Sequence, residues 1–443
     1  MNREKTIEVP VNGNRLFNKH IAVVGATGSG KSCAIAKIIQ TACSLKDSNF
    51  SGLNNTHVII FDIHGEYLTA FPSANIITSS DLILPYWLMN DEEMDELFLE
   101  VGDRNNYNQA SLLQSIITVN KKESNPTKRV FYDSPCYYDI KKVMQCFRNL
   151  QIETICAKDP TRVKIDGVDD RFLSDEEKYL KYSEKSYEFA PQKRDEFKKG
   201  SYSDGTIDKF VSRIQSKIAN PRLDFIFGEK SRITCFEDVI RKLMGYDKLH
   251  LSNVTIFDLS GIPFEVLSIT VSLITRLIFD YGYNYRKLNA ELNNPFLLIY
   301  EEAHRYVPKS ELVKYRASRL SIERIAKEGR KYGVTLLISS QRPSEISETI
   351  FSQCNNFIVM RISNPDDQNY VKNLLPENLG NIVSSLPSLE CGEALLIGDS
   401  IIMPSYVYIP KPEPEPFSND IPFYEKWKMP WAEIPFDKLM NKW

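Results

Sequence analysis

Long apolar runs are missing from this sequence of 443 residues. The longest ones, such as 296–300 and 334–338, have the length of a strand, whereas a membrane-spanning helix needs about 20 apolar residues. Paired cysteines are missing too, because the eight cysteines are scattered, with no C-x-x-C motif and no histidine cluster nearby. These absences argue against a membrane segment and a structural zinc site. Since no signal peptide is visible, they predict a cytoplasmic protein with reduced thiols.

The sequence also lacks an excess of either charge, since its formal net charge is -3. This value excludes a generally basic protein that coats nucleic acid, but it leaves room for a local basic ring or groove. The basic pairs at 121–122, 128–129 and 193–194 are interleaved with acidic residues, which favours solvated surface over a nucleic-acid site. The chain is long enough for two or three domains.

The segment 25–32 reads G-A-T-G-S-G-K-S and fits the P-loop pattern G-x-x-x-x-G-K-S. A strand-like apolar run precedes it and a helix-like run follows. Glycines let the backbone curl around a phosphate with N–H groups pointing inward, and the helix adds its positive N-terminal end. We therefore expect ATP here, with Lys31 at the β- and γ-phosphates and the Ser32 hydroxyl on Mg²⁺. The expected nucleotide-binding residues are Gly25, Thr27, Gly28, Ser29, Gly30, Lys31 and Ser32.

A pair of carboxylates supplies the second half of the predicted site. Glu301 and Glu302 follow the apolar strand at 295–300 and should lie at the C-terminal edge of a parallel sheet, where the P-loop also opens. We assign Glu301 to the metal and Glu302 to the attacking water, which it orients or deprotonates. Aspartate is usual at the first position, so Glu301 is a departure from the pattern.

Gln341 and Arg330 complete the predicted catalytic set. Gln341 follows the strand at 334–338, where its amide can bond both the γ-phosphate and water, although a plain turn residue is the alternative. Arg330 ends a charged helix, and its guanidinium can stabilise γ-phosphate charge across a subunit boundary. Arg324 and Arg361 are weaker candidates. A cation near a helix C-terminus is also common for structural reasons.

Three further polar residues, Asp62, His64 and Glu66, follow the strand at 57–61. They too should lie at the edge where ligands collect, and we expect them to position water or to contact a partner. Metal binding by the single His64 is disfavoured.

The order of these patterns predicts an α/β protein with a parallel-rich sheet that is interrupted once. Residues 1–90 and 236–410 form the two parts of the P-loop core, and 91–235 form a helical insertion. Its polar stretch at 157–205 has few apolar anchors and is expected to be mobile. Residues 411–443 form a proline-rich spacer and an aromatic tail, which docks either on its own core or on a neighbouring subunit.

Five motifs together resemble the HerA group of the HerA/FtsK superfamily of DNA-pumping ATPases. They are the P-loop segment at 19–32, D-I-H-G-E-Y at 62–67, L-I-Y-E-E-A-H at 298–304, E-G-R-K-Y-G at 328–333 and S-Q-R-P-S-E at 340–345. The resemblance implies a RecA-like ATPase core in a ring hexamer, with ATP between subunits and double-stranded DNA in the pore. It also implies that Glu302 is catalytic, that Gln341 senses phosphate and that Arg330 acts in trans.

The same resemblance implies a role and partners. Relatives act with a nuclease in DNA end processing, or with a nuclease or Sir2-like effector in anti-phage defence. Relatives also begin with a small β-barrel, for which the first 20 residues leave no room. We therefore expect a DNA translocase or helicase motor that serves an effector. The alternatives are a nucleotide-dependent ring scaffold without translocation and a type IV secretion or conjugation ATPase.

Overall fold

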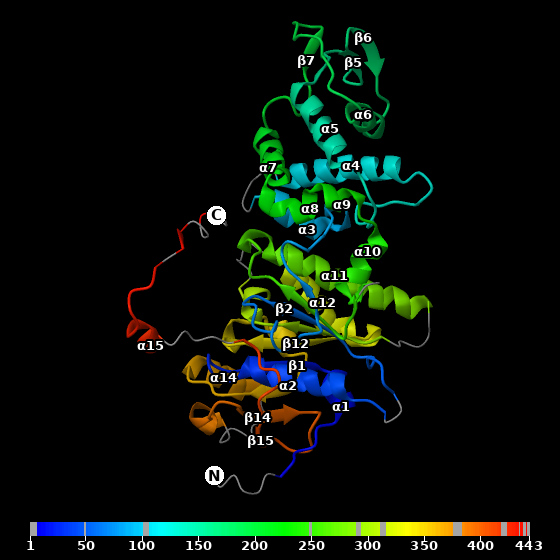
Figure 1. The fold of residues 1–443 in the computed structure, drawn as a ribbon. Coiled ribbons are helices and arrows are strands. Elements are labelled where there is room, and N and C mark those ends of the chain that lie inside the picture. Colours follow the sequence, from blue (N-terminus) through cyan, green and yellow to red (C-terminus); the bar gives the residue numbers. More distant parts are fainter. Residues whose placement is uncertain are drawn as a thin grey trace.

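A nine-stranded sheet forms the centre of the computed structural model (Figure 1), with the strand order β15-β14-β13-β1-β12-β11-β2-β10-β3. The strands are β1 (His20–Val24), β2 (His57–Asp62), β3 (Asn75–Ile77), β10 (Val254–Asp258), β11 (Phe296–Tyr300), β12 (Val334–Ser340), β13 (Cys354–Val359), β14 (Glu393–Gly398) and β15 (Ser405–Tyr408). The neighbours from β13 to β3 pair in parallel, whereas β14 and β15 add an antiparallel edge. The expected α/β fold with a parallel-rich sheet is thus confirmed. The structure describes residues 7–47, 50–100, 106–247, 250–288, 294–310, 316–374, 383–417, 423–433, 435–436 and 440.

Helices cover both faces of this sheet, which explains why its central strands are apolar throughout. Ile21 and Val23 of β1 face the cluster that contains the short α1 (Gly13–Phe17) and α2 (Lys31–Ser44). Their neighbours Ala22 and Val24 face the opposite cluster, which includes α11 (Phe264–Leu288) and α12 (Ala317–Glu328). Period-two alternation along each strand therefore feeds two separate hydrophobic cores.

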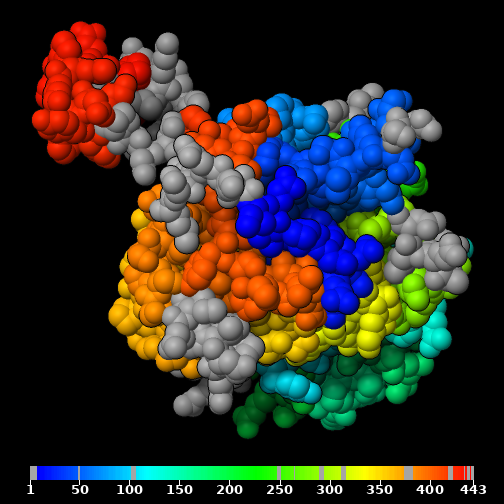
Figure 2. Space-filling model, turned by 90° about the horizontal axis from the view of Figure 1, so that it is seen from below, coloured from blue at the N-terminus to red at the C-terminus, as the bar shows by residue number. Residues whose placement is uncertain are grey.

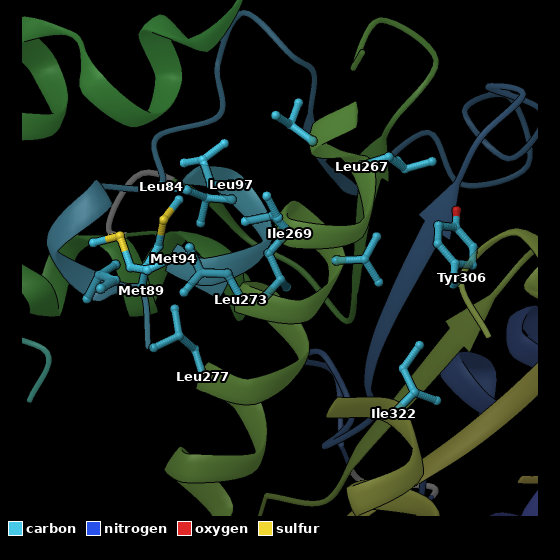
Figure 3. Close-up of a cluster of buried hydrophobic side chains, with 14 of the residues drawn as sticks. Leu84, Met89, Met94, Leu97, Leu267, Ile269, Leu273, Leu277, Tyr306 and Ile322 are labelled. Atoms are coloured by element: carbon cyan, nitrogen blue, oxygen red, sulfur yellow. The ribbon is translucent and has the colours of Figure 1, made fainter. Parts of the chain in front are cut away.

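The long helix α11 joins the sheet to the insertion. By length and composition alone, its segment Glu265–Leu288 could cross a membrane, but 78% of its most apolar window is buried inside the protein. The sequence predicts a long amphipathic or buried helix at 265–283, and α11 confirms it with five further residues at its C-terminal end. Figure 3 shows why it is apolar: Ile269, Leu273 and Leu277 face Met94 and Leu97 of the insertion.

The insertion stacks on α11, on the side away from the sheet (Figure 1). Its helices are α3 (Asp91–Phe98), α4 (Asn106–Ser124), α5 (Ile140–Ile152), α6 (Asp175–Tyr182), α7 (Asp208–Ile218), α8 (Asp224–Phe227), α9 (Glu229–Ile233) and α10 (Phe236–Leu243). A two-stranded ribbon, β8 (Tyr246–Asp247) and β9 (His250–Leu251), follows before the chain re-enters the main sheet. The largest hydrophobic cluster runs without a break from the sheet into these helices, so core and insertion share one interior.

The polar stretch at 157–205 corrects our expectation of mobility. With Thr154–Cys156 (β4) it forms a small antiparallel sheet with β5 (Arg162–Ile165), β6 (Val168–Arg171) and β7 (Phe197–Lys199), and α6 packs beside that sheet. A few aromatic rings supply its core, since Tyr182 is fully buried and packs edge-on against Phe172 and Phe189. The Tyr182 hydroxyl donates to Glu153, which also pairs with Lys178 at 2.5 Å. The polar composition was misleading because a few buried aromatic side chains are enough to hold such a small sheet together.

The C-terminal segment divides into two parts with opposite behaviour. Residues 411–417, here called the strap, lie on their own core: Gln40 donates to the Pro414 carbonyl at 2.8 Å, and Thr69 donates to the Glu415 carbonyl at 2.8 Å. The described residues from 423 onward, here called the arm, project from the body with α15 (Phe423–Trp427), as Figures 1 and 2 both show. Trp427 is 77% exposed and Trp431 98% exposed.

Candidate functional site

The loop after β1 has the geometry of an anion cradle. Gly28 (φ 71°) and Gly30 (φ 99°) adopt left-handed backbone conformations that side chains disfavour. Lys31 opens α2 and its Nζ donates to the carbonyls of Gly25 at 2.9 Å and Ala26 at 3.3 Å, so the ammonium lies over the loop. Burial lowers the pKa of Lys31, against the effect of nearby carboxylates. The two backbone carbonyls compensate the positive charge of Lys31 only in part. A phosphate bound here would supply the missing negative charge.

Two buried carboxylates stand beside this loop at the end of β11. Glu301 is 4% exposed and Glu302 5% exposed, and Glu302 has a left-handed backbone (φ 46°) that turns the chain sharply out of the strand. Glu301 Oε1 lies 3.3 Å from the Ser32 hydroxyl oxygen, while its Oε2 is buried without a hydrogen-bond partner. Burial, and then the carboxylates of Asp62 and Glu66, raise the pKa of Glu301 well above its ordinary value. A cation at this position would relieve that crowding of negative groups.

A hydrogen-bonded chain connects the P-loop to the second carboxylate. The Thr27 hydroxyl donates to Gln341 Oε1 at 2.5 Å, and Gln341 Nε2 donates in turn to Glu302 Oε1. His304 Nδ1 lies 3.3 Å from the other oxygen of Glu302, and burial lowers the pKa of this imidazole. His304 was not among the predicted catalytic residues, although its place two residues after Glu302 was a usable signal. Gln341 thus touches both the phosphate loop and the predicted base.

The loop after β2 separates the roles of its acidic residues. Asp62 is fully buried, and it accepts the backbone N–H groups of His64, Gly65 and Tyr67 at 2.8–3.1 Å. Its oxygens therefore stabilise the turn. His64 is exposed, and Glu66 instead accepts the Ser32 hydroxyl at 2.7 Å.

Arg330 lies at the opposite edge of the sheet from this cluster. It precedes β12, whereas Gln341 follows it, so about 20 Å of strand separates the two. Arg330 is exposed, and its Nη1 donates to Asn355 at 3.3 Å. Within one chain the structure therefore does not bring Arg330 to the other predicted site residues.

The arginine that does approach the P-loop is Arg361, just after β13. Its Nη2 lies 3.9 Å from the point that a Cβ on Gly28 would occupy, and its carbonyl accepts the N–H of Ala26 at 2.7 Å. Arg324, the other secondary candidate, stacks its guanidinium over Phe279 of α11 at 4.4 Å. Sequence order alone could not rank these residues, because their positions depend on which strands become neighbours of β1.

Ser32 and Glu301 suit a magnesium ion that arrives with a nucleotide. Among the described residues, no three Asp, Glu, His or Cys side chains are arranged to hold a metal by themselves. Mg²⁺ keeps several waters and is usually held by one or two carboxylates together with substrate phosphates. The unpartnered oxygen of Glu301 beside the Ser32 hydroxyl fits that donor set.

Comparisons with known proteins identify a family and several relatives. Residues 1–278 match the family model described as the central domain of the helicase HerA. The chain is 27% identical to the "DNA double-strand break repair helicase HerA" of Sulfolobus acidocaldarius over 443 residues, covering 99% of this chain and 74% of the relative. The protein of the same name from Sulfurisphaera tokodaii is also 27% identical, over 97% of this chain and 72% of the relative.

Two solved structures share the fold at low identity. The plasmid coupling protein TrwB in complex with ADP and Mg²⁺ gives a TM-score of 0.53 at 13% identity, over 95% of this chain and 93% of that chain. VirB4 of Thermoanaerobacter pseudethanolicus gives 0.53 at 11% identity, over 88% and 89%. Both structures therefore share the α/β fold that the sequence predicts. The chain belongs to the HerA helicase family of P-loop ATPases.

Proposed function

We propose that this protein is an ATP-driven motor that moves along or unwinds double-stranded DNA as a ring hexamer. The observation that carries the proposal is the chain of contacts from Thr27 through Gln341 to Glu302, because it links the phosphate loop to the base. Through these hydrogen bonds, binding of a γ-phosphate at the P-loop can change the position of Glu302, the residue that activates the attacking water.

The residues have separable tasks in this mechanism. The backbone of the P-loop and Lys31 bind the β- and γ-phosphates. Ser32 and Glu301 would hold Mg²⁺, which neutralises charge on those phosphates. Glu302 accepts the proton of the attacking water. Gln341 holds Glu302 before the nucleotide binds, and it exchanges that bond for one to the phosphate or the water afterwards.

Assembly into a ring is supported by basic side chains that lie far from the P-loop of their own chain. Arg330 is exposed at the edge opposite the P-loop, and Lys19 on that edge lies 3.6 Å from Asp399. A neighbouring subunit that presented its P-loop to this edge would receive Arg330 as a trans cation. The exposed aromatic arm agrees with such an assembly, since isolated monomers rarely display so many large apolar side chains together.

DNA as the substrate is supported by the names of the relatives, which are DNA double-strand break repair helicases. A nuclease or Sir2-like effector partner, and a role in DNA end processing or anti-phage defence, follow from the family resemblance. A ring that hydrolyses ATP slowly and only organises such an effector is the competing hypothesis.

The deciding experiment measures ATP hydrolysis with and without linear duplex DNA, alongside the mass in solution by light scattering. Glu302→Gln serves as the blank. A hexamer that duplex stimulates several-fold supports the motor. A hexamer indifferent to DNA, with no binding to long duplex at low salt, overturns the DNA part of the proposal.

A further inference from the structure

The hydroxyl of Ser32 faces two carboxylates but has only one proton to donate. Glu66 Oε2 is 2.7 Å from Ser32 Oγ, whereas Glu301 Oε1 is 3.3 Å away. Hydrogen bonds between two oxygens are shortest and strongest near 2.7–2.8 Å and weaken beyond about 3.0 Å. The proton of Ser32 therefore points to Glu66, the residue from the other loop.

This direction matters because a serine that ligates Mg²⁺ must turn a lone pair toward the ion. Its proton then has to be accepted on the opposite side, or the hydroxyl loses its orientation. Building on the Mg²⁺-dependent ATP binding proposed above, we infer that Glu66 is a positioning residue for magnesium: it accepts the Ser32 proton and holds the hydroxyl oxygen toward the metal. Glu301, with its unpartnered Oε2, is left to face the ion and its water shell.

The two glutamates thus divide a task that a single aspartate usually performs after the P-loop. Glu301 carries one more methylene than aspartate, and its Oε1 lies 3.3 Å from the serine hydroxyl oxygen. The shorter contact to the hydroxyl then comes from a different strand end, β2 instead of β11.

Glu66 is held in place from several sides, which separates it from a chance surface contact. Asp62 fixes the preceding turn through three backbone N–H groups, and Tyr67 next to Glu66 is fully buried. The N–H of Phe417 in the strap donates to the Glu66 carbonyl at 2.8 Å. A carboxylate on so constrained a backbone keeps its distance to Ser32 at little entropic cost.

Glu66→Gln is the test variant, because it preserves size and removes the charge that attracts the proton. Glu413→Gln on the neighbouring strap is the matched control, since it removes the same charge from an exposed residue that does not touch Ser32. The measurement is the affinity for a fluorescent ADP in EDTA and across a Mg²⁺ titration. We expect unchanged binding in EDTA and a rise of about 10-fold in the Mg²⁺ concentration for half-saturation.

A second comparison isolates the route through Ser32. In a Ser32→Ala background, Glu66→Gln should change the Mg²⁺ dependence no further, because the proton donor is gone. Glu66→Asp, which withdraws the carboxylate by one methylene, should reproduce most of the shift. A Glu66→Gln titration that overlays the wild-type curve overturns the inference. If the wild type itself binds ADP without any response to Mg²⁺, the proposed function fails instead.

Discussion

The two edges of the parallel sheet differ in how well one chain satisfies them. At the C-terminal edge, Lys31, Glu301, Glu302 and Gln341 meet and are buried or hydrogen-bonded to one another. At the other edge, Arg330 is exposed, and its Nη1 donates a long hydrogen bond of 3.3 Å to the neutral amide of Asn355. The first edge is a nearly complete phosphate site, and the second offers charge without a counterpart. In a ring, each edge would complete the other.

Removing Arg330 tests this comparison most severely. An arginine that reaches a neighbour's γ-phosphate contributes about 10³-fold or more to the rate, so Arg330→Ala should lower kcat to that extent while nucleotide binding persists. Mixing Arg330→Ala with Lys31→Ala subunits should restore part of the activity, because some interfaces then combine an intact P-loop with an intact Arg330. A mixture as inactive as its components would contradict the trans assignment.

Glu302→Gln should have the next largest effect. Loss of the base is expected to lower kcat by about 10²–10³-fold, and the variant should retain ATP without turnover. Rapid filtration with labelled ATP checks this retention. Lys31→Ala is the counterpart, since it should abolish nucleotide binding; equal loss of binding in both variants would remove Glu302 from the chemical step.

Arg361 sharpens the contrast between the edges because it lies on the P-loop of its own chain. We expect Arg361→Ala to raise KM for ATP by about tenfold, the loss of roughly 1.4 kcal/mol of attraction to phosphate. Unlike Arg330→Ala, this variant should gain nothing from mixing with Lys31→Ala subunits. Recovery on mixing would mean that Arg361 also acts across an interface.

The last prediction concerns folding stability, not catalysis, and involves His20 at the start of β1. His20 is fully buried, donates through Nε2 to the Ala326 carbonyl at 2.9 Å and accepts the Leu336 N–H at 3.1 Å, so it is neutral. Burial lowers its pKa to about 4. The unfolded chain binds this proton near pH 6.5, so the free energy of unfolding should fall between pH 6.5 and 4, by about 3 kcal/mol from this residue.

Denaturant titrations across that pH range measure the effect. His20→Asn should be less stable at pH 7 but should show a shallower loss on acidification. Parallel slopes for the two proteins would show that other groups dominate the acid response.

Local patterns were sufficient to predict the phosphate half of the site. The P-loop is one short run of residues, and so is the Glu301–Glu302 pair. Each directly follows an apolar strand, so the edge of the sheet at which they lie was predictable. The positions of Arg330 and Arg361 were not, because they depend on β1 lying between β12 and β13. The contact of Glu66 with Ser32 also depends on side-chain distances that spacing does not reveal. The contacts of the strap with Gln40 and Thr69 were not predictable either, because they depend on which surface of the folded core the strap crosses.

The position of β1 also sets the time at which the site can exist. His20 of β1 contacts Leu336 of β12, 316 residues farther along the chain. At a synthesis rate of about 5–20 residues per second, β1 waits roughly 15–60 s for its first neighbour. During that interval the P-loop has no strand on either side to fix its shape. A ribosome-bound chain therefore carries the motif long before it can bind a nucleotide, and its unpaired central strands need protection from aggregation in the meantime.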